Sequence, residues 1–176
     1  MDKEKVAEIL VEIGTLLELK GENPFKTRAY GNGARTIQGL TEPLEKIVAE
    51  KRLGEIKGIG EALEQKITEL VETGKLKYYQ DLKASIPPGL LAMLEISGLG
   101  PKKIQAMHKK LGIDSIETLE AACKAGKVAE LEGFGEKTQA NILEGIEMRR
   151  NYASKHRLGD ALAVAEPILE ELREHP

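Results

Sequence analysis

The stretch ISGLGPKK, residues Ile96 to Lys103, has two glycines separated by one residue, followed by a proline and two lysines. The same pattern recurs as IKGIGEAL, residues Ile56 to Leu63, and as LEGFGEKT, residues Leu131 to Thr138. Each copy has an apolar residue two positions before its first glycine, and a helical pattern follows the second glycine. Repetition with matched flanks predicts a structural unit rather than a chance turn.

The spacing of the two glycines is typical of a helix-hairpin-helix motif. Glycine permits backbone conformations and close approaches that a Cβ atom would obstruct. Because a helix starts directly after the turn, its free N–H groups and the positive end of its dipole point out of the turn. A phosphate is the natural ligand for such a place, and its binding would be independent of base sequence and sensitive to salt. The alternative is that each turn is only a tight connection in a helical bundle.

Charged residues distinguish the three turns. The first is accompanied by Lys57 and Lys66, whereas Glu132 and Glu136 crowd the third, which we expect to be mainly structural. The lysines around the second turn are Lys102, Lys103, Lys109 and Lys110. The predicted phosphate contacts of the first two turns are Lys57, Gly58, Gly60, Gly98, Gly100, Lys102 and Lys103.

The composition indicates a helical, soluble protein. Of 176 residues, 41% are hydrophobic and 3% aromatic, so we expect an all-α fold packed through Leu, Ile and Ala. The net charge of −3 argues against a strongly cationic polyanion binder, and any contact with nucleic acid must be local. The single Cys123 cannot form an intrachain disulfide, and no signal peptide or long apolar span appears. We therefore expect a cytoplasmic monomer that does not bind membranes.

The organisation along the chain predicts two small helical domains built around helix-hairpin-helix motifs. Proline and glycine cluster at residues 85–89, where we place the boundary. Residues 1–85 would hold the first hairpin, and residues 86–152 would hold the second and third. Residues 153–176 are expected to form a further helix.

Helix starts are predicted from capping residues. Asp2 is expected to cap the first helix, and Asn23, followed by Pro24, is expected to cap the second. Asp114, with Glu117 three residues later, resembles a capping box at the start of a helix in the second domain.

Four stretches resemble the amino-terminal part of family X DNA polymerases, most closely that of bacterial and archaeal members. They are GENPFKTRAYGNGARTI (Gly21 to Ile37), IKGIGEALEQKITELVETGKL (Ile56 to Leu76), PPGLLAMLEISGLGPKKI (Pro87 to Ile104) and LEGFGEKTQANIL (Leu131 to Leu143). The resemblance implies a small lyase domain followed by a DNA-binding subdomain of this nucleotidyltransferase family. It also implies binding of gapped, nicked or primer-template DNA during base excision repair.

In this family a lysine after the first hairpin removes 5′-deoxyribose phosphate, and Lys66 occupies its place. Lys26 and Tyr30 match family positions that bind the 5′-phosphate and orient the site. The chemistry requires a neutral amine that attacks the sugar aldehyde, forms a Schiff base and allows β-elimination. Partial burial beside Leu63 and Ile67 would favour that neutral amine. The alternative is that Lys66 is an ordinary solvated lysine, so lyase activity is a hypothesis.

The resemblance also implies a monovalent cation, Na⁺ or K⁺, at each of the first two hairpins, because hard cations prefer oxygen ligands. By position, the backbone carbonyls would be those of Gly54, Ile56 and Ile59, and of Leu94, Ile96 and Leu99. No other cofactor is expected for DNA binding. The chain departs from the family where a phosphate-binding lysine of the animal enzymes falls on Ala62. A basic position before the first hairpin falls on Gly54 and Glu55, and Lys57 and Arg35 are expected to substitute for the missing charges.

Polymerisation in this family needs a palm domain whose carboxylates hold two metal ions. The sequence stops at about the point where that domain should begin, so we expect no nucleotidyl transfer here, and Mg or Mn only with a palm. The histidines, His108, His156 and His175, lack metal-ligand spacing. The hypotheses are a DNA-binding part of a family X polymerase, a noncatalytic helix-hairpin-helix or adaptor module, and a protein-interaction domain with purely structural turns.

Overall fold

The computed structural model describes residues 1–152, which form helices and no strand, so the predicted all-α class is confirmed. In chain order the elements are α1 (Lys3–Leu19), α2 (Pro24–Gln38), α3 (Leu44–Ala49), the 3₁₀ turn η1 (Leu53–Glu55), α4 (Glu61–Thr73), α5 (Lys77–Ala84), α6 (Pro88–Met93), α7 (Pro101–Leu111) and α8 (Ile116–Lys124). Residues 135–152 are also helical. The helix predicted at residues 153–176 lies outside the described residues.

The chain divides into two compact units. Of the described residues, the first comprises Met1–Leu91 and Gly100–Gly112, and the second comprises Ala92–Leu99 and residues 113–152. Helix α7 therefore belongs with α1 to α5, and it packs against α1. The domain boundary near residue 85, which turn residues alone suggested, stays a prediction.

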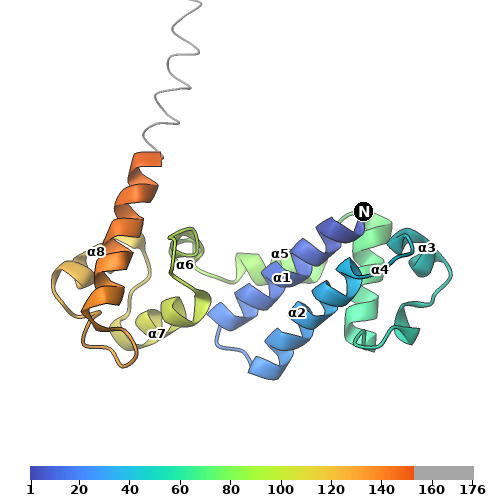
Figure 1. The fold of residues 1–176 in the computed structure, drawn as a ribbon, viewed down its shortest axis with the longest axis horizontal. Coiled ribbons are helices and arrows are strands. Elements are labelled where there is room, and N and C mark those ends of the chain that lie inside the picture. The colour runs from blue at the N-terminus through green and yellow to red at the C-terminus, as the bar shows by residue number, and fades with distance from the viewer. Residues whose placement is uncertain (153–176) are drawn as a thin grey trace, which may run out of the picture. The chain divides into compact units, whose positions relative to one another are not determined.

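Helices α1 and α2 form the centre of the first unit and run side by side (Figure 1). The buried face of α1 carries Val6, Leu10, Ile13 and Leu17, at the spacing of a single helical face. From α2, Ala34 and Ile37 are equally buried. This packing leaves the polar face of α2 in solvent, where both Lys26 and Arg35 are exposed.

The predicted caps of α1 and α2 are confirmed. The Asp2 carboxylate accepts a hydrogen bond from the Lys5 backbone N–H at 2.8 Å, which satisfies one free donor of the first turn. Likewise, the Asn23 side chain accepts from the Phe25 N–H at 2.9 Å, with Pro24 at the first helical position. Local chemistry therefore fixes the start of both central helices.

The capping box predicted for Asp114 and Glu117 is wrong by one residue. Ser115 is the N-cap of α8, because its side chain accepts from the Thr118 N–H at 3.2 Å. In return the Thr118 hydroxyl accepts from the Ser115 N–H at 3.1 Å. This register places Leu119 and Cys123 together on the buried face of α8, which outweighs the preference of Asp114 for a cap.

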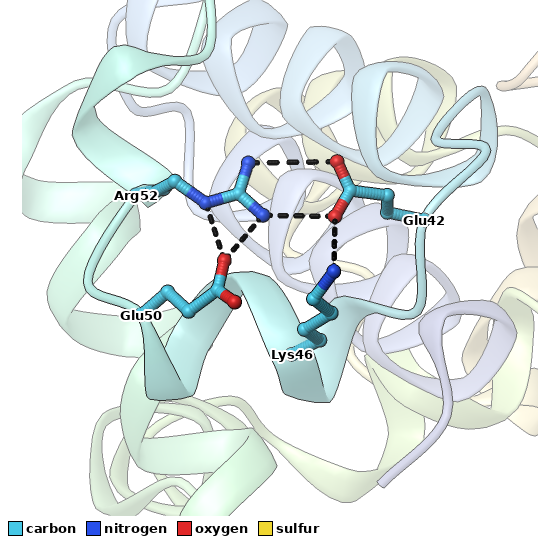
Figure 2. Close-up of polar contacts among 4 residues, drawn as sticks. All are labelled: Glu42, Lys46, Glu50 and Arg52. Atoms are coloured by element: carbon cyan, nitrogen blue, oxygen red, sulfur yellow. Dashed lines mark hydrogen bonds and ion pairs between the residues drawn. The ribbon is translucent and has the colours of Figure 1, made fainter.

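An ion-pair network fixes the segment around the short helix α3 (Figure 2). The Arg52 guanidinium contacts the Glu42 carboxylate at 2.8 Å and, through Nε, the Glu50 carboxylate at 2.7 Å. Lys46 lies 3.4 Å from the same Glu42 carboxylate. Hydrogen bonding to Arg52, and then to Lys46, lowers the pKa of Glu42 below its ordinary value. The network joins the residues before and after α3 and so anchors the chain that leads into η1 and the first hairpin.

Candidate nucleic-acid interface

The first hairpin is a tight turn that needs glycine at one position. The Ile56 carbonyl accepts a hydrogen bond from the Ile59 N–H at 3.0 Å, and Gly58 between them has φ of +98°. A positive φ at this place in the turn favours glycine, because other side chains rarely adopt it. Gly60 then takes an extended conformation, with φ −88° and ψ 167°, as the N-cap of α4.

The second hairpin repeats this geometry. The Ile96 carbonyl accepts from the Leu99 N–H at 3.1 Å, and Gly98 has φ of +78°. Gly100 is extended, with φ −85° and ψ 164°, and α7 starts with Pro101. Neither α4 nor α7 has a side-chain cap, so the first N–H groups of both helices are left without a capping acceptor. Both turns therefore carry the backbone donors that an anion binds.

The third hairpin departs from the other two at its second glycine. Its turn closes in the same way, since the Leu131 carbonyl accepts from the Phe134 N–H at 3.0 Å and Gly133 has φ of +83°. However, Gly135 has φ of +74°, whereas Gly60 and Gly100 are extended. The chain therefore enters helix 135–152 by a different route. This difference adds to the acidic flanks as a reason to leave the third hairpin out of the interface.

The second glycine of each of the first two hairpins is not explained by the fold of the chain. The φ values of Gly60 and Gly100 are available to any residue. An ideal Cβ at either position would meet no atom within 4 Å. Since neither backbone strain nor internal packing requires glycine there, the open space is suited to a ligand that approaches the backbone closely.

The predicted basic residues lie at the surface. Thr36 lies 3.5 Å from the position that a Cβ on Gly58 would take, so the last turn of α2, which carries Arg35, is beside the first hairpin. Lys57 is exposed within the turn itself. At the second hairpin Lys102 is exposed and lies 3.6 Å from Glu18, while Lys103 is half-buried.

Lys26 and Lys102 each have a carboxylate neighbour. Lys26 lies 3.4 Å from Glu22, one helical turn away, and Lys102 pairs with Glu18. Solvent-exposed ion pairs of this kind contribute about 0–1 kcal/mol. Their disruption is a small cost beside a charge-assisted contact to DNA.

Lys66 has an aromatic neighbour that the sequence did not indicate. Its amine lies 4.7 Å from the centroid of the Tyr78 ring and donates to the Ala62 carbonyl at 3.1 Å. Tyr30 is buried, and this burial, followed by hydrogen bonding to Tyr78, raises the pKa of Tyr30 well above its ordinary value. Lys66 and Tyr30 are thus both neighbours of Tyr78.

The carbonyl positions predicted for a cation are not alike in the two hairpins. Beside the first, a Glu64 carboxylate oxygen lies 2.9 Å from where a Cβ on Gly54 would be. The corresponding position of α7 is Ile104, which is fully buried. The two hairpins therefore differ in the neighbours of these positions, and a monovalent cation at either one stays a prediction.

Membrane-spanning helices and clustered metal ligands are both absent from residues 1–152. In that part of the chain no helix is both long enough and apolar enough to cross a membrane. Within the same residues no group of three or more His, Cys, Asp or Glu side chains is arranged to hold a metal ion.

Comparison with known families agrees with this geometry. Residues 1–76 match the helix-hairpin-helix domain family, and residues 90–148 match the family described as a SAM-like helix-hairpin-helix tandem. Two consecutive segments of the chain thus match helix-hairpin-helix families. Over 172 residues it is 33% identical to the DNA polymerase/3'-5' exonuclease PolX of Bacillus subtilis (strain 168), an alignment that covers 98% of this chain. The predicted resemblance to family X DNA polymerases is confirmed.

The similarity covers only part of that relative. The chain spans 30% of the length of the Bacillus protein. The polymerase and exonuclease activities named for the relative are therefore statements about that protein, and they do not transfer to this chain through identity alone.

Proposed function

We propose that this chain binds the DNA backbone through its first two hairpins, without reading base sequence, and that it prefers gapped or nicked DNA in base excision repair. The observation that carries the proposal is the glycine at Gly60 and at Gly100, where the protein itself needs none. Uncapped helix N-termini supply donors at both places, and exposed lysines supply charge. The similarity to a polymerase over nearly the whole chain supports DNA as the polymer.

The test is a binding series with intact, nicked and one-nucleotide-gapped duplexes, each with and without a 5′-phosphate at the break. Preference for the 5′-phosphorylated gap supports the proposal. Uniform binding to every duplex favours a general helix-hairpin-helix or adaptor module instead. Absence of binding at low salt would leave the protein-interaction hypothesis, because a phosphate contact strengthens as salt is removed.

We propose 5′-deoxyribose-phosphate lyase activity as a second function of the first unit. The arrangement of Lys66, Tyr78 and Tyr30 supports it, because the Lys66 amine on α4 lies 4.7 Å from the centroid of the Tyr78 ring and buried Tyr30 is a neighbour of the same ring. The neutral amine would add to C1′ of the sugar aldehyde and lose water to give a protonated Schiff base. Loss of a C2′ proton then breaks the C3′–O bond, which releases the downstream strand with its own 5′-phosphate.

Borohydride trapping tests this step. Reduction of the Schiff base on DNA that carries a 5′-deoxyribose phosphate should give a covalent complex with the wild-type protein. Lys66→Ala should abolish most of the complex while retaining affinity for gapped DNA. Undiminished trapping in that variant would remove Lys66 from the role.

A further inference from the structure

A groove in the first unit is lined by lysines and by no carboxylate, as an anion-binding site would be, and its lining residues lie outside the three Gly-x-Gly turns. It has a volume of about 430 Å³ and is formed by the end of α1, the segment from α5 to α6, and α7. Its polar lining residues are Lys20, Ser85, Gln105, His108 and Lys109. Its apolar floor consists of Leu19, Ile86 and Leu90, all buried.

The charge of its lining residues distinguishes this groove from the other two grooves described in residues 1–152. A second groove, beside α3 and α4, is lined by the carboxylates of Glu61, Glu64, Glu69 and Glu72, with Lys51 as its only cation. A third, beside helix 135–152, includes Glu144 and no cation. The groove at the end of α1 is lined by two lysines and by no carboxylate. Its field therefore favours an anion, and the apolar floor reduces screening.

The polar groups of this groove are held in place by the fold. The Lys20 amine donates to the Ser85 hydroxyl at 3.0 Å, and this hydroxyl donates in turn to the Leu82 carbonyl at 2.7 Å. Lys20 is thus held at the groove by a neutral partner, which leaves its charge uncompensated. Gly21 has φ of +75°, and a Cβ there would collide with the Gln105 amide, so this glycine permits the amide to lie over the turn. The two carboxylates next in sequence, Glu18 and Glu22, pair with lysines outside the groove.

We propose that this groove is a phosphate-binding site, and that it holds a backbone phosphate of bound DNA in addition to those at the hairpins. The ammonium groups of Lys20 and Lys109 would supply charge, and the Gln105 amide would donate a hydrogen bond. Such contacts carry no base information and position the duplex only. The groove presents the same chemistry to a DNA phosphate and to inorganic phosphate. The assignment of a DNA phosphate therefore rests on the proposed DNA binding.

The first experiment measures the salt dependence of binding to the 5′-phosphorylated gapped duplex. The variant Lys20→Gln/Lys109→Gln is compared with Lys5→Gln/Lys124→Gln, which removes the same charge from exposed lysines that line no part of the groove. If the groove variant no longer binds one phosphate, the slope of log K against log salt should fall by about 0.9 in that variant only. We expect a three- to tenfold loss of affinity, on the order of 1 kcal/mol, at the salt concentration of the cell. Equal slopes in the groove variant and the control variant would overturn the assignment.

The second experiment separates DNA from a free anion. Amide chemical shifts of Lys20, Ser85 and Gln105 are followed while gapped DNA or inorganic phosphate is added to the wild-type protein. We expect these amide shifts to change when DNA is added at stoichiometric amounts. Changes with inorganic phosphate but not with DNA would overturn a DNA site. If the wild-type protein binds no DNA, the proposed function itself fails; if it binds DNA and these amides do not move, only the groove assignment fails.

Discussion

The amine of Lys66 lies 4.7 Å from the centroid of the Tyr78 ring, which is within the range of a cation–π interaction. The two residues come from different helices, α4 and α5, so the contact forms only when these helices pack. Tyr78 also interacts with buried Tyr30 of α2. Three helices therefore converge on the amine that the lyase hypothesis requires.

Replacing the ring should reduce trapping while leaving DNA affinity intact. Tyr78→Leu removes the contact that restrains the Lys66 side chain, and we expect the rate of borohydride trapping to fall about two- to fivefold, as about 0.5–1 kcal/mol would give. Tyr78→Phe keeps the ring and should lose less of the rate than Tyr78→Leu does. Trapping by Tyr78→Leu at the wild-type rate would show that the contact has no part in the reaction.

The hairpin glycines provide a test that separates folding from binding. At Gly60 and Gly100 an alanine fits both the backbone conformation and the space, so each substitution should change the free energy of unfolding by less than about 1 kcal/mol. Affinity for gapped DNA should nevertheless fall at least tenfold, because the methyl group would occupy the approach of the phosphate. Thermal unfolding and fluorescence anisotropy measure the two quantities on the same samples.

Gly58→Ala and Gly135→Ala are the matched controls for the change in the free energy of unfolding, because both glycines have positive φ, whereas Gly60 and Gly100 do not. Each should lower the free energy of unfolding by about 1–2 kcal/mol, the cost of a left-handed conformation for an ordinary residue. Gly135→Ala should leave DNA affinity unchanged in conditions where the protein stays folded. A loss of affinity there would bring the third hairpin into the interface.

The three hairpins have features that the sequence pattern predicts and one that it does not. The turns and the caps of α1 and α2 at Asp2 and Asn23 follow from local chemistry, so the pattern of residues predicts them, whereas the start of α8 was predicted one residue too early. The left-handed Gly135 is invisible in sequence, because the same Gly-x-Gly spacing is compatible with two ways of entering the next helix. Tyr78 was missed for another reason: its partner is on a different helix, and no periodicity along α5 marks it.

Charge reversal at the second hairpin should weaken DNA binding, because it removes contacts to the phosphates of the DNA backbone. Lys102→Glu plus Lys103→Glu removes positive charge beside the free N–H groups of α7, and the salt slope should fall by about one unit for each phosphate that the variant no longer binds. The substitution at Lys102 also leaves the Glu18 carboxylate without its lysine partner, which adds negative charge beside the hairpin. Unchanged affinity would show that ISGLGPKK does not touch DNA.

The contact between α1 and α5 predicts a dependence of stability on pH. Burial alone would raise the pKa of Glu12, but hydrogen bonds from Tyr79 and Lys83 outweigh it and lower this pKa below its ordinary value. The Lys83 amine lies 2.9 Å from the carboxylate. Because the pKa is lowered in the folded state, the stabilisation is present above the unfolded pKa of about 4.3 and is lost as pH falls through the folded value.

Glu12→Gln should therefore lower the unfolding midpoint at neutral pH and have little effect in acid. We expect about 0.5 kcal/mol at pH 7, since the side chain is 42% exposed and solvent screens the ion pair. Urea titrations at a series of pH values from neutral to strongly acidic measure the difference. Asp81→Asn, which removes a carboxylate paired with the exposed Lys77, is the charge-matched control. A difference that stays constant from neutral to acidic pH would exclude ionisation of Glu12 as its source.

Cys123 should report on opening of the second unit. The residue is buried on α8, and this burial raises the pKa of its thiol to about 11. The thiolate is the reactive form, so a disulfide reagent at neutral pH should modify the native protein far more slowly than the unfolded chain. Labelling measured across a denaturant series should follow the population of open molecules, because buried groups react only after local or global unfolding. Rapid modification under native conditions, at the rate of the unfolded protein, would mean that α8 does not protect Cys123 in solution.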